Sequence, residues 1–170
     1  MILLRKAKEK DISTISNLAE QIWPQTYSAY ISETQLRFML DKMYNQVELL
    51  SQLQNGHVFL IASENGKNVG FAGFSIIEPK NNRYKLHKLY VLPEMQGKGV
   101  GKTLMNKVIN LVIHEGGKTL QLNVNRNNSA KHFYLKAGFN IKETVNIDIG
   151  NGFFMNDYVM EIMLCQSLKD

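Results

Sequence analysis

The segment that most constrains this chain is a glycine-rich stretch at residues 93–102, which reads Pro-Glu-Met-Gln-Gly-Lys-Gly-Val-Gly-Lys. Residues 85–92, just before it, read as a β-strand. The residues after it place apolar side chains at helical spacing. These apolar positions are Val100, Leu104, Met105, Val108, Ile109, Leu111 and Val112. The glycines therefore lie where a strand turns into a helix.

Glycines at such a turn allow consecutive backbone N–H groups to face an anion, and the helix dipole adds positive potential there. Lys98 and Lys102 support this interpretation, because cations at a helix N-terminus are unfavourable unless an anion is bound. Two common phosphate loops do not fit. The Walker A pattern needs glycine at Gln96, and the dinucleotide fingerprint needs glycine at Lys102. The segment predicts a pyrophosphate loop of another kind, with a glycine-rich loop that binds nothing as the alternative.

The loop reads Q-G-x-G-x-G and follows a strand that ends V-x-P. A second motif, N-x-x-A-x-x-x-Y-x-x-x-G-F, runs from Asn127 to Phe139. In order and separation the two motifs resemble those of the GNAT superfamily of N-acetyltransferases, whose acetyl-coenzyme A loop reads Q/R-x-x-G-x-G/A. The resemblance covers residues 85–139. It implies an N-acetyltransferase with the GNAT fold that uses acetyl-coenzyme A as cosubstrate.

Length and charge are consistent with such an enzyme. A chain of 170 residues is expected to form one domain, residues 1–170. The net charge of +5 comes from scattered Lys and Arg, without the interleaved aromatic residues of a nucleic-acid-binding surface. Coenzyme A is itself polyanionic, so this charge suits a small-molecule ligand. We expect no nucleic-acid partner.

Other features exclude further classes. The single cysteine, Cys165, excludes an internal disulfide and a cysteine-based zinc site, and we place it in the last strand. No grouping of His, Asp and Glu has metal-ligand spacing, so no metal is expected. No apolar run could span a bilayer, so we expect no membrane partner and a cytoplasmic protein, either a monomer or a homodimer.

Hydrophobic periodicity and turn signals predict the order of elements. The expected strands lie near residues 2–6, 57–63, 68–77, 85–92, 119–124, 139–149 and 153–164, and the later helices near 46–54, 100–115 and 128–137. A helical crossover makes strands 85–92 and 119–124 parallel. The predicted class is α/β (α+β), a GNAT fold with a mixed, mostly antiparallel sheet of six to seven strands flanked by helices.

Local signals refine this prediction. Asp11 is expected to cap a first helix that Pro24 ends, and Ser32 opens a second helix with a capping box. The Asn65-Gly66 dipeptide predicts a hairpin turn. Strand 119–124 alternates Leu and Val with amide residues, so one side of it is expected to line a polar cleft.

Acyl transfer from a thioester to an amine needs a base for the ammonium, stabilisation of an oxyanion and an acid for the leaving thiolate. By resemblance, Tyr134 occupies the position of that acid. A phenol with a pKa of about 10 can protonate a thiolate of a thiol with a pKa of about 8.5. The alternative is a core tyrosine on a short amphipathic helix.

The resemblance also implies a cofactor site. Backbone groups of Leu89, Tyr90 and Val91 would pair with the pantetheine arm, and Asn127 and Tyr134 would contact the cofactor further along. The pyrophosphate would be held by Gln96, Gly97, Lys98, Gly99, Val100, Gly101 and Lys102.

His87 is the candidate base. It lies two residues before Leu89, on the same face of the strand, where several family members place a histidine or a glutamate. The near-neutral pKa of a histidine suits this task. The alternative is a packed or solvent-bonded histidine. His57, His114 and His132 have no support from a motif.

The amine acceptor is the least determined part. Family acceptor pockets are usually built by the first helices and the last hairpin, where this chain carries aromatic residues. We take Trp23, Tyr27 and Phe154 as candidate substrate residues; the same aromatics could simply be core. The tail around Phe154, Met155 and Asp157 weakly resembles bacterial spermidine/spermine-type acetyltransferases, which favours a small primary amine such as a polyamine. A protein or peptide N-acetyltransferase and a catalytically silent coenzyme A-binding module are the alternatives.

Overall fold

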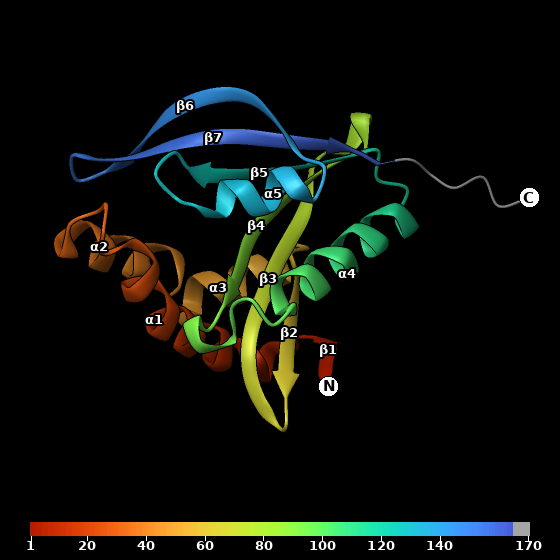
Figure 1. The fold of residues 1–170 in the computed structure, drawn as a ribbon, viewed down its shortest axis with the longest axis horizontal. Helices are drawn as coiled ribbons and strands as arrows, with labels where there is room; N and C mark the ends of the chain where they lie inside the picture. The colour runs from red at the N-terminus through yellow and green to blue at the C-terminus, as the bar shows by residue number, and fades with distance from the viewer. Residues whose placement is uncertain (165–170) are drawn as a thin grey trace, which may run out of the picture. The chain divides into compact units, whose positions relative to one another are not determined.

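The computed structural model describes residues 1–164 of the chain, so Cys165 lies outside the described residues (Figure 1). The strands are β1 (Ile2–Lys6), β2 (Val58–Glu64), β3 (Lys67–Glu78), β4 (Arg83–Val91), β5 (Thr119–Asn125), β6 (Asn140–Gly150) and β7 (Phe153–Met163). The helices are α1 (Ile12–Tyr27), α2 (Glu33–Met43), α3 (Gln46–Gln54), α4 (Val100–His114) and α5 (Ala130–Lys136). Each predicted element is present, with ends shifted by a few residues at most.

The strands form a seven-stranded sheet in the order β1-β2-β3-β4-β5-β7-β6. Strands β4 and β5 pair in parallel, from Arg83 opposite Thr119 to Leu86 opposite Leu122. The pairs β1–β2, β2–β3, β5–β7 and β6–β7 are antiparallel. The prediction of a mixed, mostly antiparallel sheet with one central parallel pair is therefore confirmed.

Contacts divide the chain into two compact units. Unit 1 contains Met1–Ser75 and Lys88–Val108, and unit 2 contains Ile76–His87 and the residues from Ile109 onward. Fully buried side chains of unit 1 include Ile15, Ile22, Leu40, Leu49, Phe59, Phe71 and Leu104. In unit 2, Leu120, Met160 and Phe139 are fully buried, and α5 lies across one face of β5 (Figure 1). Each unit thus has its own apolar core.

Pro24 does not end α1, contrary to our prediction. The helix continues to Tyr27, and the N–H of Ser28 still donates to the Pro24 carbonyl at 3.2 Å. Proline removes one helical hydrogen bond. Trp23 and Tyr27, on either side of it, pack against each other with ring centres 4.5 Å apart. We attribute the continuation to this packing, which sequence periodicity could not show.

Asp11 precedes α1 as predicted, but its side chain does not cap the helix. The carboxylate instead accepts two hydrogen bonds from Arg5, at 2.7 and 2.9 Å, and a third from the N–H of Lys8. The hydrogen bonds from Arg5 lower the pKa of Asp11 to about 2. Two hydrogen bonds from an arginine guanidinium stabilise a carboxylate more than one hydrogen bond from a helix N–H does. The Asp11 side chain therefore binds Arg5 and does not cap the helix.

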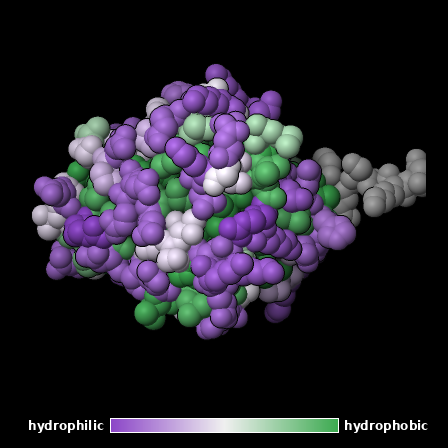
Figure 2. Space-filling model, turned by 90° about the horizontal axis from the view of Figure 1, so that it is seen from below, coloured by the Kyte–Doolittle hydropathy of each residue, from purple (hydrophilic) through white to green (hydrophobic). Residues whose placement is uncertain are grey.

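Two other local predictions are confirmed. The Ser32 hydroxyl accepts from the N–H of Gln35 at 3.1 Å, as an N-cap should. Asn65 and Gly66 form the turn between β2 and β3. The face drawn in Figure 2 is largely hydrophilic, with hydrophobic residues interrupted by polar ones. No helix within residues 1–164 is both long enough and apolar enough to cross a membrane.

Candidate functional site

The C-terminal half of β4 is held against β3 by an unusually close approach at Gly70. A Cβ atom at Gly70 would lie 2.7 Å from the backbone oxygen of Tyr90. The N–H of Leu92 donates to the oxygen of Val69 at 2.9 Å. Only glycine allows this approach, which fixes the position of the strand residues that lead into the glycine loop.

The glycine loop connects β4 to α4. Gly97 has a φ of 76° and Gly99 a φ of 84°, a conformation that other L-residues rarely adopt. The N–H and the hydroxyl of Thr103 both bond to the oxygen of Gly99 at 2.9 Å, which ties the loop to the first turn of α4. The left-handed backbone conformation of the loop therefore explains why glycine occupies positions 97 and 99.

This loop fits a diphosphate. The earliest N–H groups of a helix have no helical partner, and here they belong to the residues just before Thr103. They follow two left-handed glycines, and the side chains of Lys98 and Lys102 are exposed at the same turn. Backbone donors, a helix N-terminus and two cations are the features that stabilise a phosphate group.

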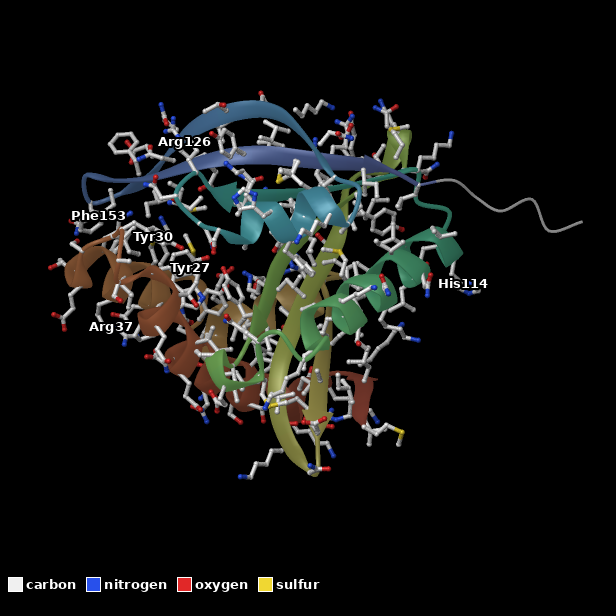
Figure 3. The ribbon with its side chains drawn as sticks, in the orientation of Figure 1. Tyr27, Tyr30, Arg37, His114, Arg126 and Phe153 are labelled. Atoms are coloured by element: carbon white, nitrogen blue, oxygen red, sulfur yellow. The ribbon has the colours of Figure 1, made fainter. Side chains whose placement is uncertain are left out.

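Unit 1 also gathers an aromatic cluster at the end of α1. We define it as Trp23, Tyr27, Tyr30, Tyr44, Phe71 and Tyr90. The Trp23 ring centre lies 5.1 Å from that of Tyr44 and 5.8 Å from that of Tyr90. The Tyr27 and Tyr90 hydroxyls are 2.8 Å apart, and Tyr27 and Tyr30 lie together at the helix end (Figure 3). Of the predicted substrate residues, Trp23 and Tyr27 are thus brought together beside β4.

Two polar atoms of this cluster are buried without a hydrogen-bond partner in the described part of the chain: Trp23 Nε1 and the Tyr30 hydroxyl. Trp23 is only 2% exposed, and burial raises the pKa of Tyr30 to about 12. Both side chains therefore keep a neutral hydrogen-bond donor at a buried position. Buried polar groups normally have a hydrogen-bond partner, so packing alone does not explain these two donors. Phe154, the third predicted substrate residue, belongs to unit 2 and is 47% exposed.

Tyr134 lies on α5 in unit 2. Its ring centre is 5.3 Å from that of Phe133 and 5.9 Å from that of Phe139, and only 8% of the residue is exposed. Burial raises the pKa of the Tyr134 hydroxyl, so the group is protonated at neutral pH. The side chain is both well packed and a proton donor, so packing and an acid role are compatible.

His87 and Asn127 are also in unit 2. His87 is the first residue of β4 after its last pair with β5, Leu86 opposite Leu122, and it is half-buried. Asn127 follows β5 in an exposed turn, where its N–H donates to Asn125 Oδ1 at 2.9 Å. Both residues thus lie beyond the carboxyl end of the parallel pairing.

The polar side of β5 continues onto β7. Leu120, Leu122 and Val124 are buried, whereas the alternate residues Gln121, Asn123 and Asn125 are half-exposed, as the alternation predicted. On β7, Asp157 lies opposite Asn125 and Glu161 opposite Gln121. The Gln121 amide donates to Glu161 at 3.1 Å. These side chains form one polar face in unit 2.

Two buried charges, one on β4 and one on β7, were not identified as site residues from the sequence. Lys88 is 7% exposed, and its Nζ lies 3.0 Å from Gln52 Oε1 and 5.2 Å from the Tyr44 ring centre. Asp157 is 3% exposed. The signal for Lys88 was present, because alternation places it on the same face of β4 as Leu86 and Tyr90. The burial of Asp157 depends on tertiary packing and left no such signal.

No group of three or more His, Cys, Asp or Glu side chains within residues 1–164 is arranged to hold a metal ion.

Residues 14–139 match the acetyltransferase (GNAT) family. This segment covers most of the chain, and the chain belongs to that family. The family, the N-acetyltransferases among its relatives and a structural neighbour that contains coenzyme A together identify it as an acetyl-CoA-dependent N-acetyltransferase.

Two relatives differ in the acceptor that they are named for. The chain is 29% identical over 153 residues to spermidine N(1)-acetyltransferase of Thermoplasma acidophilum, covering 86% of this chain and 93% of the relative. It is 35% identical over 88 residues to the ribosomal protein bS18-alanine N-acetyltransferase of Haemophilus influenzae, covering 52% of this chain and 57% of that one.

The crystal structure of PaiA N-acetyltransferase from Thermoplasma acidophilum in complex with coenzyme A has a similar fold. Its TM-score is 0.81 at 28% identity, with 96% of this chain and 99% of that chain covered.

Proposed function

We propose that this N-acetyltransferase acetylates a primary amine of a small molecule, and that polyamines are the first acceptors to test. The observation that carries the proposal is the similarity to a spermidine acetyltransferase, which covers 86% of this chain and 93% of that relative. A match of this extent reaches well beyond the cofactor motifs of residues 85–139, which alone would leave the acceptor open.

We further propose how the residues divide the chemistry. The backbone of Leu89, Tyr90 and Val91 pairs with the pantetheine arm, and the glycine loop, Gln96 to Lys102, holds the pyrophosphate. The buried, protonated hydroxyl of Tyr134 supports its role as the acid for the leaving thiolate.

The base in this scheme is His87. It removes a proton from the ammonium group, and the neutral nitrogen then forms the C–N bond as the C–S bond breaks. Tyr134 gives its proton to the sulfur, and the second proton that the nitrogen loses on becoming an amide restores the phenol. The position of His87 at the end of the β4–β5 pairing, where it is half-buried, supports this role.

The aromatic cluster supports an amine acceptor. Trp23 and Tyr27 lie beside Tyr90 on the strand expected to carry the thioester, and aromatic faces attract ammonium groups. In this proposal Trp23, Tyr27 and Phe154 contact the acceptor.

A peptide acceptor is the second candidate, because a relative that matches half of this chain is named as a ribosomal protein bS18-alanine N-acetyltransferase. The two candidates are separated by measuring thiol release from acetyl-CoA, corrected for hydrolysis, with spermidine and with a short alanine-terminated peptide. Acetylation of spermidine supports the proposal, and a clear preference for the peptide would replace it.

A further inference from the structure

Asp157 is a buried carboxylate on the polar face of unit 2. It lies on β7 opposite Asn125 of β5 and is 3% exposed. Burial raises its pKa, and the side chain of Asn123 donates a hydrogen bond to it. A carboxylate has room for about four hydrogen bonds, so most of its acceptor capacity is not used by Asn123.

Two cations of unit 2 act on Asp157 from a distance, and two others are engaged elsewhere. Lys85 and Arg126 act on it electrostatically, but neither makes an ion pair with it within 4.0 Å in residues 1–164. Arg126 donates instead to Asn146 of β6, beside the β6–β7 hairpin (Figure 3). Arg83 and Lys142 pair with Glu161.

A buried carboxylate without a contacting cation is costly, and such groups are normally paired. Lys85 is itself desolvated, which lowers its pKa. In the part of the chain that the structure describes, neither Lys85 nor Arg126 forms an ion pair with the Asp157 carboxylate, and the ammonium group of a bound ligand would supply that contact.

The position of Asp157 connects this feature to the acceptor. The last parallel pair is Leu86 opposite Leu122, and β5 runs on through Asn123 to Asn125. Asp157 lies opposite Asn125, so it is beyond the end of the β4–β5 pairing, as His87 is. The carboxylate and the proposed base are thus at the same end of unit 2.

We propose that Asp157 binds a second, non-reacting ammonium group of the acceptor, so that diamines and polyamines are preferred over monoamines. The reacting nitrogen must lose its proton before it attacks, so it is not the group that a carboxylate should hold in its charged form. A second ammonium on the same molecule keeps its proton and completes the pairing of Asp157. This inference rests on the proposed function.

The test compares wild type, Asp157→Asn and the control Asp148→Asn with two acceptors, spermidine and the monoamine n-butylamine. Asp148 is exposed on β6, where it accepts from the N–H of Gly150. Losing a hydrogen-bonded charge pair should raise the KM of Asp157→Asn for spermidine about tenfold to a hundredfold. The kcat, the parameters for n-butylamine and all parameters of the control should change little.

Unfolding in urea separates this role from a structural one. Asparagine removes a buried charge, so the free energy of unfolding of Asp157→Asn should be equal to or above that of wild type. If Asp157→Asn does not fold, Asp157→Ser is a second neutral variant with the same expected kinetics. A loss of stability with equal deficits for both amines would make Asp157 a structural residue and overturn the inference.

The remaining outcomes keep the two proposals apart. An unchanged KM for spermidine in the neutral variant, with active wild type, overturns the role of Asp157 and leaves the proposed function intact. If wild type acetylates neither amine but acetylates the alanine-terminated peptide, the small-molecule function fails and this inference fails with it.

Discussion

At the scale of single residues, Tyr134 has a ring held by Phe133 and Phe139 and a hydroxyl kept protonated by burial. Tyr134→Phe removes the hydroxyl and keeps the ring, so the affinity for acetyl-CoA should remain close to that of wild type. If the phenol protonates the thiolate, kcat should fall about 10²-fold or more. Steady-state kinetics with spermidine, together with acetyl-CoA titration, measure both quantities.

His87→Gln provides the comparison for that experiment. Its rate deficit should shrink as the pH rises, because more of the amine is then neutral without a base, whereas the deficit of Tyr134→Phe should not shrink in this way. Near-normal turnover of Tyr134→Phe would remove the phenol from the mechanism.

Lys88 gives a prediction about stability rather than catalysis. Burial lowers its pKa to about 8 from the ordinary value of 10.5, so between these two pH values the unfolded chain binds more protons than the folded one. The free energy of unfolding should therefore rise with pH across this window, by up to ~3 kcal/mol. Below pH 8 the buried lysine is charged and this gain is absent.

Lys88→Met should remove the dependence, because methionine keeps the length of the side chain and carries no charge. We expect the variant to unfold at higher urea concentration than wild type at pH 7, with the difference shrinking toward pH 10. Lys107→Met, at an exposed position of α4, is the control and should follow wild type at both pH values. A parallel pH profile for wild type and Lys88→Met would show that Lys88 does not titrate in this range.

At the scale of elements, the glycine loop joins a strand to a helix through two left-handed residues. Gly99→Asp and Gly99→Asn place isosteric side chains at a φ of 84°, so both strain the loop to a similar degree. Only aspartate adds a negative charge beside the expected pyrophosphate. Stabilisation by acetyl-CoA, measured as a shift in Tm, should be retained in part by Gly99→Asn and be lost in Gly99→Asp.

Equal loss of that shift in both variants would mean that backbone strain, and not charge, removes binding. An unchanged shift in Gly99→Asp would place the pyrophosphate elsewhere.

Elements with local signals were predictable from the sequence. The Ser32 cap and the Asn65-Gly66 turn depend on residues within a few positions of each other, and both are present. The predictions that Pro24 ends α1 and that Asp11 caps it were wrong, because both outcomes depend on contacts with other side chains. Aromatic packing stabilises α1 beyond the proline, and Arg5 binds the Asp11 carboxylate.

The same distinction applies to the candidate site. The glycine loop and the alternation of β5 can be read from neighbouring residues, and their conformations agree with the sequence. Alternation along β4 places Lys88 on the face of Leu86 and Tyr90, whereas the burial of Asp157 depends on which elements cover β7, and no local pattern encodes that covering. The roles of Tyr134 and His87 rest on a resemblance of motifs and stay predictions for the kinetics described above.

At the scale of the whole molecule, any ligand that binds only the folded state raises the free energy of unfolding. Acetyl-CoA at about 100 times its Kd should add ~2.7 kcal/mol. For a chain of this size, that corresponds to a rise in Tm of roughly 5–10 °C. The increase should be dose-dependent and should not saturate at low concentration, since the stabilisation grows with the logarithm of free ligand.

Trp23 makes this measurement specific to unit 1, because it is the single tryptophan of the sequence and is buried in the aromatic cluster there. Its fluorescence should report a higher midpoint with acetyl-CoA and with coenzyme A, since both carry the pyrophosphate that the loop is expected to hold. Adenosine lacks that group and should leave the midpoint unchanged. A midpoint that moves equally with adenosine would assign the stabilisation to the base and sugar and would remove the glycine loop from the binding site.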